Sequence, residues 1–264
     1  MNAIKRLVPV VVVSCLLLAA TLIVYLQAIN FELVHIEDVI LYEEYSARLD
    51  AFGFPLLSLF HMPSNAVYMV PVSNFVGFFD TWLCGENVGM LHLMNVVAHA
   101  MNGILLFLIL RAATGALWRS AFAAAIFVLH PVNTENVVSW CRGPTLIVSF
   151  FFLLSFLVYL YYSRRHSLKR YALIVACLFL ALMSKPSIIY LPFLLLLFDY
   201  WPLKRWCQDP QGASKNRYAS APPSRLILEK VPLLLILAFW LAVCLFVVRM
   251  GPPLPENAPQ PVSY

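Results

Sequence analysis

The chain has 264 residues, of which 62% are hydrophobic and 12% are charged. Soluble domains are about 45–50% apolar and about 25% charged, so this composition excludes an ordinary soluble domain and indicates a protein that has lipid as its solvent. The formal net charge of +5 comes from basic residues scattered between apolar runs, and this scatter argues against nucleic acid as a partner.

The first apolar run, residues 7–29, follows Lys5 and Arg6. The apolar region of a signal peptide is about 7–15 residues long, whereas about 20 apolar residues cross a bilayer, so we expect an uncleaved anchor. Further apolar runs follow at residues 91–110, 120–129, 145–162, 171–184, 187–201 and 231–248. The predicted fold is an all-α integral membrane protein with about seven transmembrane helices.

The stretch 171–201 is too long for one span and short for two. If it forms a hairpin with Lys185 and Pro186 at an outer tip, 14 Lys and Arg residues lie inside and 4 lie outside. A single crossing gives 9 inside and 8 outside and leaves Lys185 within the membrane, which costs about 3 kcal/mol. The positive-inside rule therefore favours the hairpin, a cytosolic N-terminus and an outer proline-rich tail at residues 251–264.

The two long loops differ in composition. The outer loop, residues 30–90, mixes acidic and aromatic residues with prolines, which is typical of short amphipathic helices on a membrane interface. The inner loop, residues 202–230, is basic and polar, and we interpret it as a solvated connector that touches anionic lipid. Since 10 of the 13 acidic residues fall outside, we expect polar chemistry on the extracytoplasmic face. The membrane would be a bacterial inner membrane, or that of the endoplasmic reticulum in a eukaryote.

The second apolar run carries a polar stripe. His92, Asn95, His99 and Asn102 are spaced three, four and three residues apart, which places them on one face of a helix. Polar side chains within a span either form hydrogen bonds between helices or line a wet cavity. The sequence leaves both alternatives open for this stripe, including a substrate cavity that opens outward.

Three further sets of residues lie near the predicted outer surface. The adjacent carboxylates Glu37 and Asp38 are candidates for a general base, although exposed acid pairs are usually only solvated. His130 and Glu135 could bind a divalent metal, but their spacing is no recognised ligand pair, and a capping role is the alternative. Arg142 and Lys185 could hold a phosphate at headgroup depth, unless Lys185 only snorkels to lipid.

The sequence contains no Walker loop, dinucleotide fingerprint or nucleophile elbow. Nucleotide-activated donors are generally lacking on an outer face. A lipid-linked phosphate donor fits the predicted site better, because its tail stays in the bilayer while its phosphate meets Arg142 or Lys185.

Four segments carry a resemblance to a known family: HIEDVILY, GMLHLMNVVAHAMNGILLFLILRAATG, FVLHPVNTENVVSW and LMSKPSIIYLPFLLLLFDYWPLKR. The chain resembles the membrane module of the type-C glycosyltransferases, especially the transmembrane and tetratricopeptide-repeat proteins related to protein O-mannosyltransferases. The resemblance implies inverting transfer of a sugar from a polyprenyl- or dolichyl-phosphate donor to a hydroxyl of a protein or glycan acceptor. It also implies that Glu37 or Asp38 is the base, that Glu135 is the acid of the third segment, and that Lys185 contacts the lipid phosphate.

The sequence also departs from the family. The first residue of the acidic pair is Glu37, where relatives usually have aspartate, and the chain stops at Tyr264, where relatives continue with more spans and repeats. We therefore expect a C-terminally truncated member. The alternatives are a non-catalytic membrane scaffold or remnant and a small-molecule transporter, and the absence of paired repeats between the two halves argues against the transporter.

Overall fold

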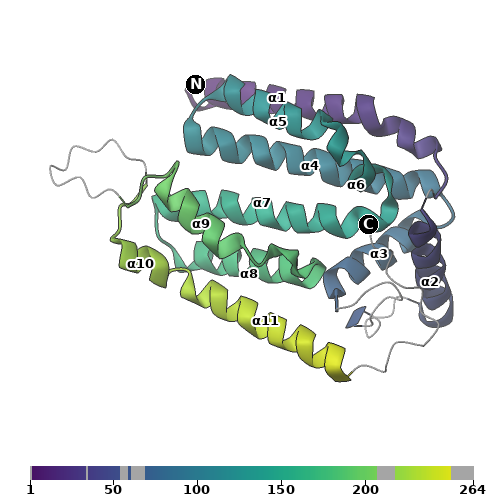
Figure 1. Ribbon diagram of the computed structural model, residues 1–264. Coiled ribbons are helices and arrows are strands. Elements are labelled where there is room, and N and C mark those ends of the chain that lie inside the picture. Colours follow the sequence, from purple (N-terminus) through teal and green to yellow (C-terminus); the bar gives the residue numbers. More distant parts are fainter. Residues whose placement is uncertain (1, 34, 54–58, 61–68, 207–217, 251–264) are drawn as a thin grey trace.

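The computed structural model describes residues 2–33, 35–53, 59–60, 69–206 and 218–250. These residues form helices and no strand, as the predicted all-α class requires. Figure 1 shows the longer helices lying side by side, with two short helices packed across one end of them. The predicted tail, residues 251–264, and parts of both predicted loops lie outside the described residues.

In chain order, the helices are α1 (Asn2–Tyr25), η1 (Leu26–Asn30), α2 (Ile36–Phe52), α3 (Pro71–Cys84), α4 (Val88–Thr114), α5 (Leu117–Leu129), η3 (Pro131–Asn133), α6 (Thr134–Val138), η4 (Trp140–Arg142), α7 (Gly143–Arg164), α8 (Leu168–Ser184), η5 (Pro186–Ile188), α9 (Leu191–Tyr200), α10 (Pro223–Leu228) and α11 (Val231–Met250). The elements labelled η are short 3-10 helices.

Local sequence explains where several helices end. Helix α4 ends at Gly115, whose φ of 76° is a left-handed conformation that only glycine adopts without cost. Helices α5 and α8 end just before Pro131 and Pro186, at residues with extended backbone. A proline disfavours the helical conformation of the residue before it, so these two prolines set both breaks.

Four segments are long and apolar enough to cross a membrane: Leu7–Asn30, Val88–Thr114, Trp140–Arg164 and Pro223–Val247. A fifth span results if Leu117–Leu129 and Pro131–Val138, which meet at a 49° bend, are counted together. These helices suit an integral membrane protein. Helix α8 has 17 residues, and the apolar stretch Pro186–Tyr200 is also short of a full span. The seven predicted spans therefore stay a prediction.

Helix α4 lies at the centre of the packing, between α1 and α5 on one side and α7 on the other (Figure 1). Its approach to α5 depends on Gly103, because a Cβ at that position would lie only 2.1 Å from Cγ1 of Val128. The largest apolar core lies among α7, α8, α9 and α11 and includes Leu160, Leu178 and Leu195. Helix α3 in turn packs against α7 and α8.

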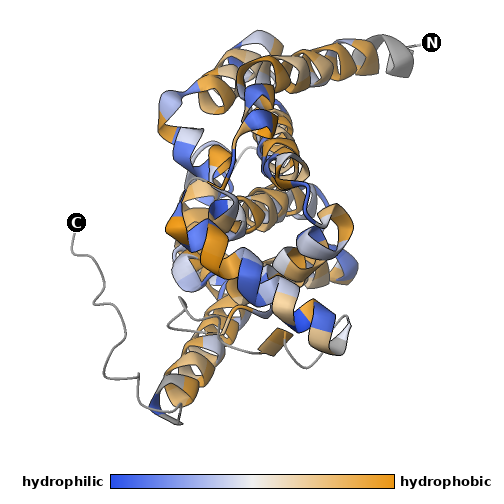
Figure 2. Cartoon of the chain, turned by 90° about the vertical axis from the view of Figure 1, so that its right-hand side faces the viewer, coloured by the Kyte–Doolittle hydropathy of each residue, from blue (hydrophilic) through white to orange (hydrophobic). Residues whose placement is uncertain are grey.

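The distribution of polar and apolar side chains on helix α3 is the reverse of that on a helix of a soluble protein. Its buried face carries polar side chains, among them Asn74 and Asp80, while Phe75, Phe79 and Trp82 are exposed. The three exposed rings form a row, with centroids 6.2 and 6.1 Å apart. Figure 2 looks onto this end of the molecule and shows hydrophilic residues among its short helices and turns. An exposed aromatic row beside polar segments is what a membrane interface favours.

Candidate functional site

Asp38 is fully buried at the first turn of α2 and is held by residues far away in the sequence. Its Oδ1 accepts hydrogen bonds from the Cys141 backbone N–H at 2.7 Å and from the Ser139 hydroxyl at 3.1 Å. Its Oδ2 accepts from the His35 backbone N–H at 3.4 Å, which makes Asp38 part of the helix cap. The carboxylate thus fastens α2 to the segment between α6 and α7.

Glu37 is exposed, in contrast to its neighbour, and its Oε2 accepts from Cys141 Sγ at 3.6 Å. The sequence presents Glu37 and Asp38 as equivalent candidates for a base. Since the carboxylate of Asp38 is enclosed and already accepts several hydrogen bonds, Glu37 is the member of the pair that can reach an outside ligand.

Two cations lie beside the segment that binds Asp38, since Arg142 follows Cys141 in the chain and Lys185 contacts Thr145. Arg142 forms an ion pair of 3.0 Å with Glu135, and Lys185 donates from Nζ to Thr145 Oγ1 at 3.2 Å. Burial lowers the pKa of Lys185, and the nearby positive charge of Arg142 lowers it further. Both cations therefore lie close together beside the segment that binds Asp38.

We call this group the outer polar cluster. It comprises Glu37, Asp38, Glu135, Ser139, Cys141, Arg142, Thr145 and Lys185. The five charged members were all predicted from the sequence as site residues, and the structure connects them by hydrogen bonds, an ion pair and short chain segments. Ser139, Cys141 and Thr145 were not predicted, because their role depends on bonds to residues about 40 to 100 positions away.

The polar stripe of α4 is buried, and each of its four side chains bonds a backbone carbonyl. The pairs are His92 Nε2 with Glu32 at 3.3 Å, Asn95 Nδ2 with Ser139 at 2.8 Å, His99 Nε2 with Val128 at 3.2 Å, and Asn102 Nδ2 with Leu146 at 3.0 Å. These contacts match the hydrogen-bonding alternative. They bind α4 to the breaks between the helices around it.

His130 is exposed, and its Nδ1 accepts from the Val132 backbone N–H at 3.1 Å. This bond caps the 3-10 helix η3, as the capping alternative supposes. Within the described ranges no three His, Cys, Asp or Glu side chains are grouped closely enough to hold a metal ion.

Asp80 is a buried acid of α3 that was not predicted as a site residue. Its side chain is hydrogen-bonded to that of Trp140, which lies between Ser139 and Cys141. Burial raises the pKa of Asp80 to about 6, although the bond to Trp140 opposes the shift. The available signal was the position of Asp80 on the inward face of a helix whose outward face carries Phe75, Phe79 and Trp82.

A cleft of about 490 Å³ lies between α2 and α3, beside the outer polar cluster. Its lining includes Tyr42, Ser46 and Asp50 from α2 and Thr81 from α3. Tyr42 lies one helical turn after Asp38 and contacts the Trp140 ring edge-on, with centroids 6.3 Å apart. The cleft therefore begins next to the residues that hold Asp38.

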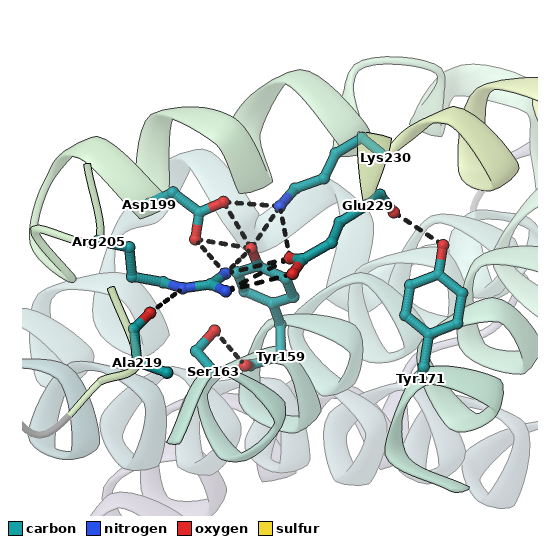
Figure 3. Close-up of polar contacts among 8 residues, drawn as sticks. All are labelled: Tyr159, Ser163, Tyr171, Asp199, Arg205, Ala219, Glu229 and Lys230. Carbon is teal, nitrogen blue, oxygen red and sulfur yellow. Dashed lines mark hydrogen bonds and ion pairs between the residues drawn. The ribbon is translucent and has the colours of Figure 1, made fainter. Parts of the chain in front are cut away.

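A second polar group, the buried ion cluster, lies at the other end of the long helices and is drawn in Figure 3. It comprises Tyr159 of α7, Asp199 of α9, Arg205, Glu229 and Lys230. Arg205 donates to Asp199 at 2.9 Å and lies 3.3 Å from Glu229, while Lys230 donates to Asp199 at 2.6 Å. Two cations and two carboxylates thus balance each other around the Tyr159 hydroxyl.

The buried ion cluster corrects the interpretation of residues 202–230 as a solvated connector. Arg205 is 0% and Lys230 is 1% exposed, and Leu226 is buried between them in the sequence. Both described ends of this loop pack against α7 and α9. Their charged side chains can be buried because they are paired with each other, whereas unpaired charges could not be buried. The signal was Asp199, an acid within an apolar run, whose partners become visible only in the fold.

Comparison of the chain with family models, with curated proteins and with solved structures finds no match.

Proposed function

We propose that this chain is a membrane glycosyltransferase module that moves a sugar from a polyprenyl- or dolichyl-phosphate donor to an acceptor hydroxyl at the extracytoplasmic face. The observation that carries the proposal is the attachment of Asp38 to Ser139 and Cys141. This attachment sets an accessible carboxylate, Glu37, beside the segment that carries Arg142 and contacts Lys185. A base next to a pair of cations is what transfer from a phosphate-linked donor requires.

Glu37 is the proposed general base, and Asp38 is the residue that fixes its helix. Glu37 takes the proton of the acceptor hydroxyl, and the acceptor oxygen attacks the anomeric carbon. The bond between that carbon and the phosphate oxygen breaks, and configuration inverts. The leaving lipid phosphate keeps the bonding electrons, and Arg142 and Lys185 stabilise its negative charge. Arg142 already has one partner in Glu135, and this surface ion pair is weak enough to yield to a phosphate.

The same proposal includes the seven-span topology with a cytosolic N-terminus. In Figure 1 the chain direction alternates from α4 through α5, α7, α8 and α9 to α11, which supports α8 and α9 as the two arms of the predicted hairpin. The aromatic row of α3 would then lie in the outer interface and hold the polar cluster at headgroup depth.

The test is transfer by the purified full chain in lipid nanodiscs, with a short-chain polyprenyl-phosphate sugar as donor and peptide hydroxyls as acceptors. Glu37→Gln should abolish transfer, and Glu43→Gln, an exposed acid on the same helix, should leave it unchanged. Equal activity of the two variants would reject Glu37 as the base.

A non-catalytic scaffold is the second candidate. It is favoured by the hydrogen bonds of the α4 stripe and of Asp38, which are all internal and structural. Under this alternative, wild-type protein would neither transfer sugar nor bind the lipid-phosphate donor, while folding normally. Saturable donor binding that Lys185→Gln weakens and Lys169→Gln does not would exclude the scaffold alternative.

A further inference from the structure

The Ser139–Cys141 segment is held between carboxylates of two helices. Asp38 of α2 accepts hydrogen bonds from Ser139 and Cys141, and Asp80 of α3 is hydrogen-bonded to Trp140, the residue between them. Each acid is buried, and Asp80 is only 6% exposed. The proposed base, Glu37, contacts the same segment through Cys141.

The ring of Trp140 is enclosed, so the orientation of this ring fixes the position of the backbone to which it is attached. Tyr42 and Tyr45 of α2 meet it edge-on, with centroids 6.3 and 6.0 Å away. Its indole N–H can point to only one partner, and a buried indole that loses its partner retains an unsatisfied donor. The Asp80 carboxylate therefore determines the orientation of the Trp140 side chain and, through it, the position of the backbone on both sides.

We propose that Asp80 is a positioning residue of the site: it anchors Trp140, and through Trp140 it aligns the Ser139 and Cys141 donors that hold Asp38 and contact Glu37. This inference rests on the proposed function for its catalytic consequence, but the anchoring itself does not depend on it. Asp80 touches neither donor nor acceptor in this scheme and acts only through other residues.

The charge state of Asp80 gives this anchor a pH dependence. Among the ionisable groups, Cys84 on α3 interacts electrostatically with Asp80, Tyr45 of α2 contacts the Trp140 ring, and Cys141 follows Trp140 in the chain. The nearby ionisable residues of α4, of η4 and at the end of α8 bond elsewhere, since His92 contacts the Glu32 carbonyl, Arg142 pairs with Glu135 and Lys185 donates to Thr145. Burial raises the pKa of Asp80 to about 6, so it ionises near neutral pH.

The ionised carboxylate accepts a stronger hydrogen bond than the neutral acid. We therefore expect the segment to be held firmly above pH 6 and more loosely below it. Asp80→Asn keeps a side chain of the same size that can still accept from the indole, but it cannot ionise. Trp140→Phe keeps a ring but removes the donor.

The first experiment is independent of activity. The Trp140 contribution to fluorescence, taken as wild type minus Trp140→Phe, should change with a midpoint near pH 6, and this transition should be absent from Asp80→Asn. Alkylation at Cys141, read by mass spectrometry at constant pH, should be about tenfold faster in Trp140→Phe, as expected when one hydrogen bond to a charged group is lost. Asp50→Asn, a change of an exposed acid on α2, should alter neither measurement. A transition that survives in Asp80→Asn overturns the proposal.

The second experiment connects the anchor to catalysis. In the sugar-transfer assay, kcat of wild type should fall as the pH drops through 6, with little change in the donor KM, and Asp80→Asn should remove this inflection. If wild type transfers no sugar while the fluorescence and alkylation results hold, the proposed function fails and the anchoring stands. If transfer occurs and its inflection near pH 6 persists in Asp80→Asn, the positioning role fails and the proposed function stands.

Discussion

Lys230 Nζ lies 2.6 Å from Asp199 Oδ2, although 31 positions separate the two residues. The same ammonium lies 2.5 Å from the Tyr159 hydroxyl, and Arg205 bonds the other carboxylate oxygen. The contact therefore joins the start of α11 to the end of α9 and to α7. It gives α9, a helix of only 10 residues, a polar attachment in addition to its buried leucines.

The first prediction concerns this contact. Lys230→Met should destabilise the protein by about 3–5 kcal/mol, because it leaves the Asp199 carboxylate buried with reduced compensation. The double variant Lys230→Met with Asp199→Asn removes one charge of each sign and should recover much of the loss. Reversible unfolding in mixed micelles, followed by fluorescence, measures both. If the destabilisation of the double variant equalled the sum for the two single variants, the ion pair would not couple Lys230 and Asp199.

The second prediction concerns the proposed base. Glu37→Gln should lower kcat for sugar transfer by about 10²–10⁴-fold, the range expected when a general base is removed. Asp38→Asn should reduce both kcat and stability, because the amide oxygen accepts from Ser139 and Cys141 without the negative charge and the amide nitrogen cannot accept from the His35 backbone N–H. Steady-state kinetics and a thermal melt separate the two effects. If Asp38→Asn lost stability but kept its activity, the anchoring by Asp38 would not be needed for the proposed base to act.

The third prediction concerns stability and pH. Burial raises the pKa of Asp80 from 3.8 to about 6, so the folded state binds this proton more tightly than the unfolded state does. The favourable contribution is complete below pH 3.8 and is lost as the pH rises through 6. Asp80→Asn should therefore be more stable than wild type at pH 7.5, by at most about 3 kcal/mol, and should have nearly the same stability at about pH 3, below the unfolded pKa. A stability difference that does not change with pH would contradict the assigned cause.

The fourth prediction concerns the aromatic row of α3. Trp82 is exposed beside Phe79, whereas Trp140 is buried, so Trp82 should meet lipid and Trp140 should not. Lipids brominated near the headgroup end of their chains should quench part of the tryptophan fluorescence in nanodiscs. That part should decrease in Trp82→Phe, which retains the exposed Trp118 and Trp201, and should be unchanged in Trp140→Phe. Quenching that Trp82→Phe leaves intact would place α3 away from the interface.

The fifth prediction concerns topology. Cysteines introduced at Glu43 and Ser224, both exposed, should react with an impermeant maleimide from opposite sides of sealed vesicles, the first from the extracytoplasmic side. The native cysteines also react with the maleimide, so labelling of the parent chain is measured as the background. Labelling of both positions from the same side would reject the hairpin around Lys185.

Much of the helical order could be predicted, because apolar runs are a local signal. Residues 91–110 and 145–162 fall within α4 and α7, and the stripe from His92 to Asn102 shares one buried face. The short run 120–129 proved to be part of a bent pair of helices, since Pro131 breaks the helix at that point.

The contacts of the sites were harder to predict, for a physical reason. The charged residues of the outer polar cluster were chosen by residue type, but their partners Ser139, Cys141 and Thr145 carry no charge and no periodic pattern. Arg205 and Lys230 were misassigned to solvent because a basic loop usually is solvated. Only the return of α9 and α11 to α7 brings Asp199, Glu229 and Tyr159 close enough to compensate their charges.

The stripe on α4 also constrains how the protein is made. Three of its four carbonyl partners, at Val128, Ser139 and Leu146, are synthesised after α4 itself, and α4 is the least apolar of the four clear spans. When it first reaches the bilayer, its two asparagines and two histidines therefore have almost nothing to bond. The insertion machinery, trapped water or an early pairing with α1 must supply hydrogen-bond partners for these side chains until α5 and α7 are inserted. The retention of α4 in a bilayer should therefore depend on the helices that follow it.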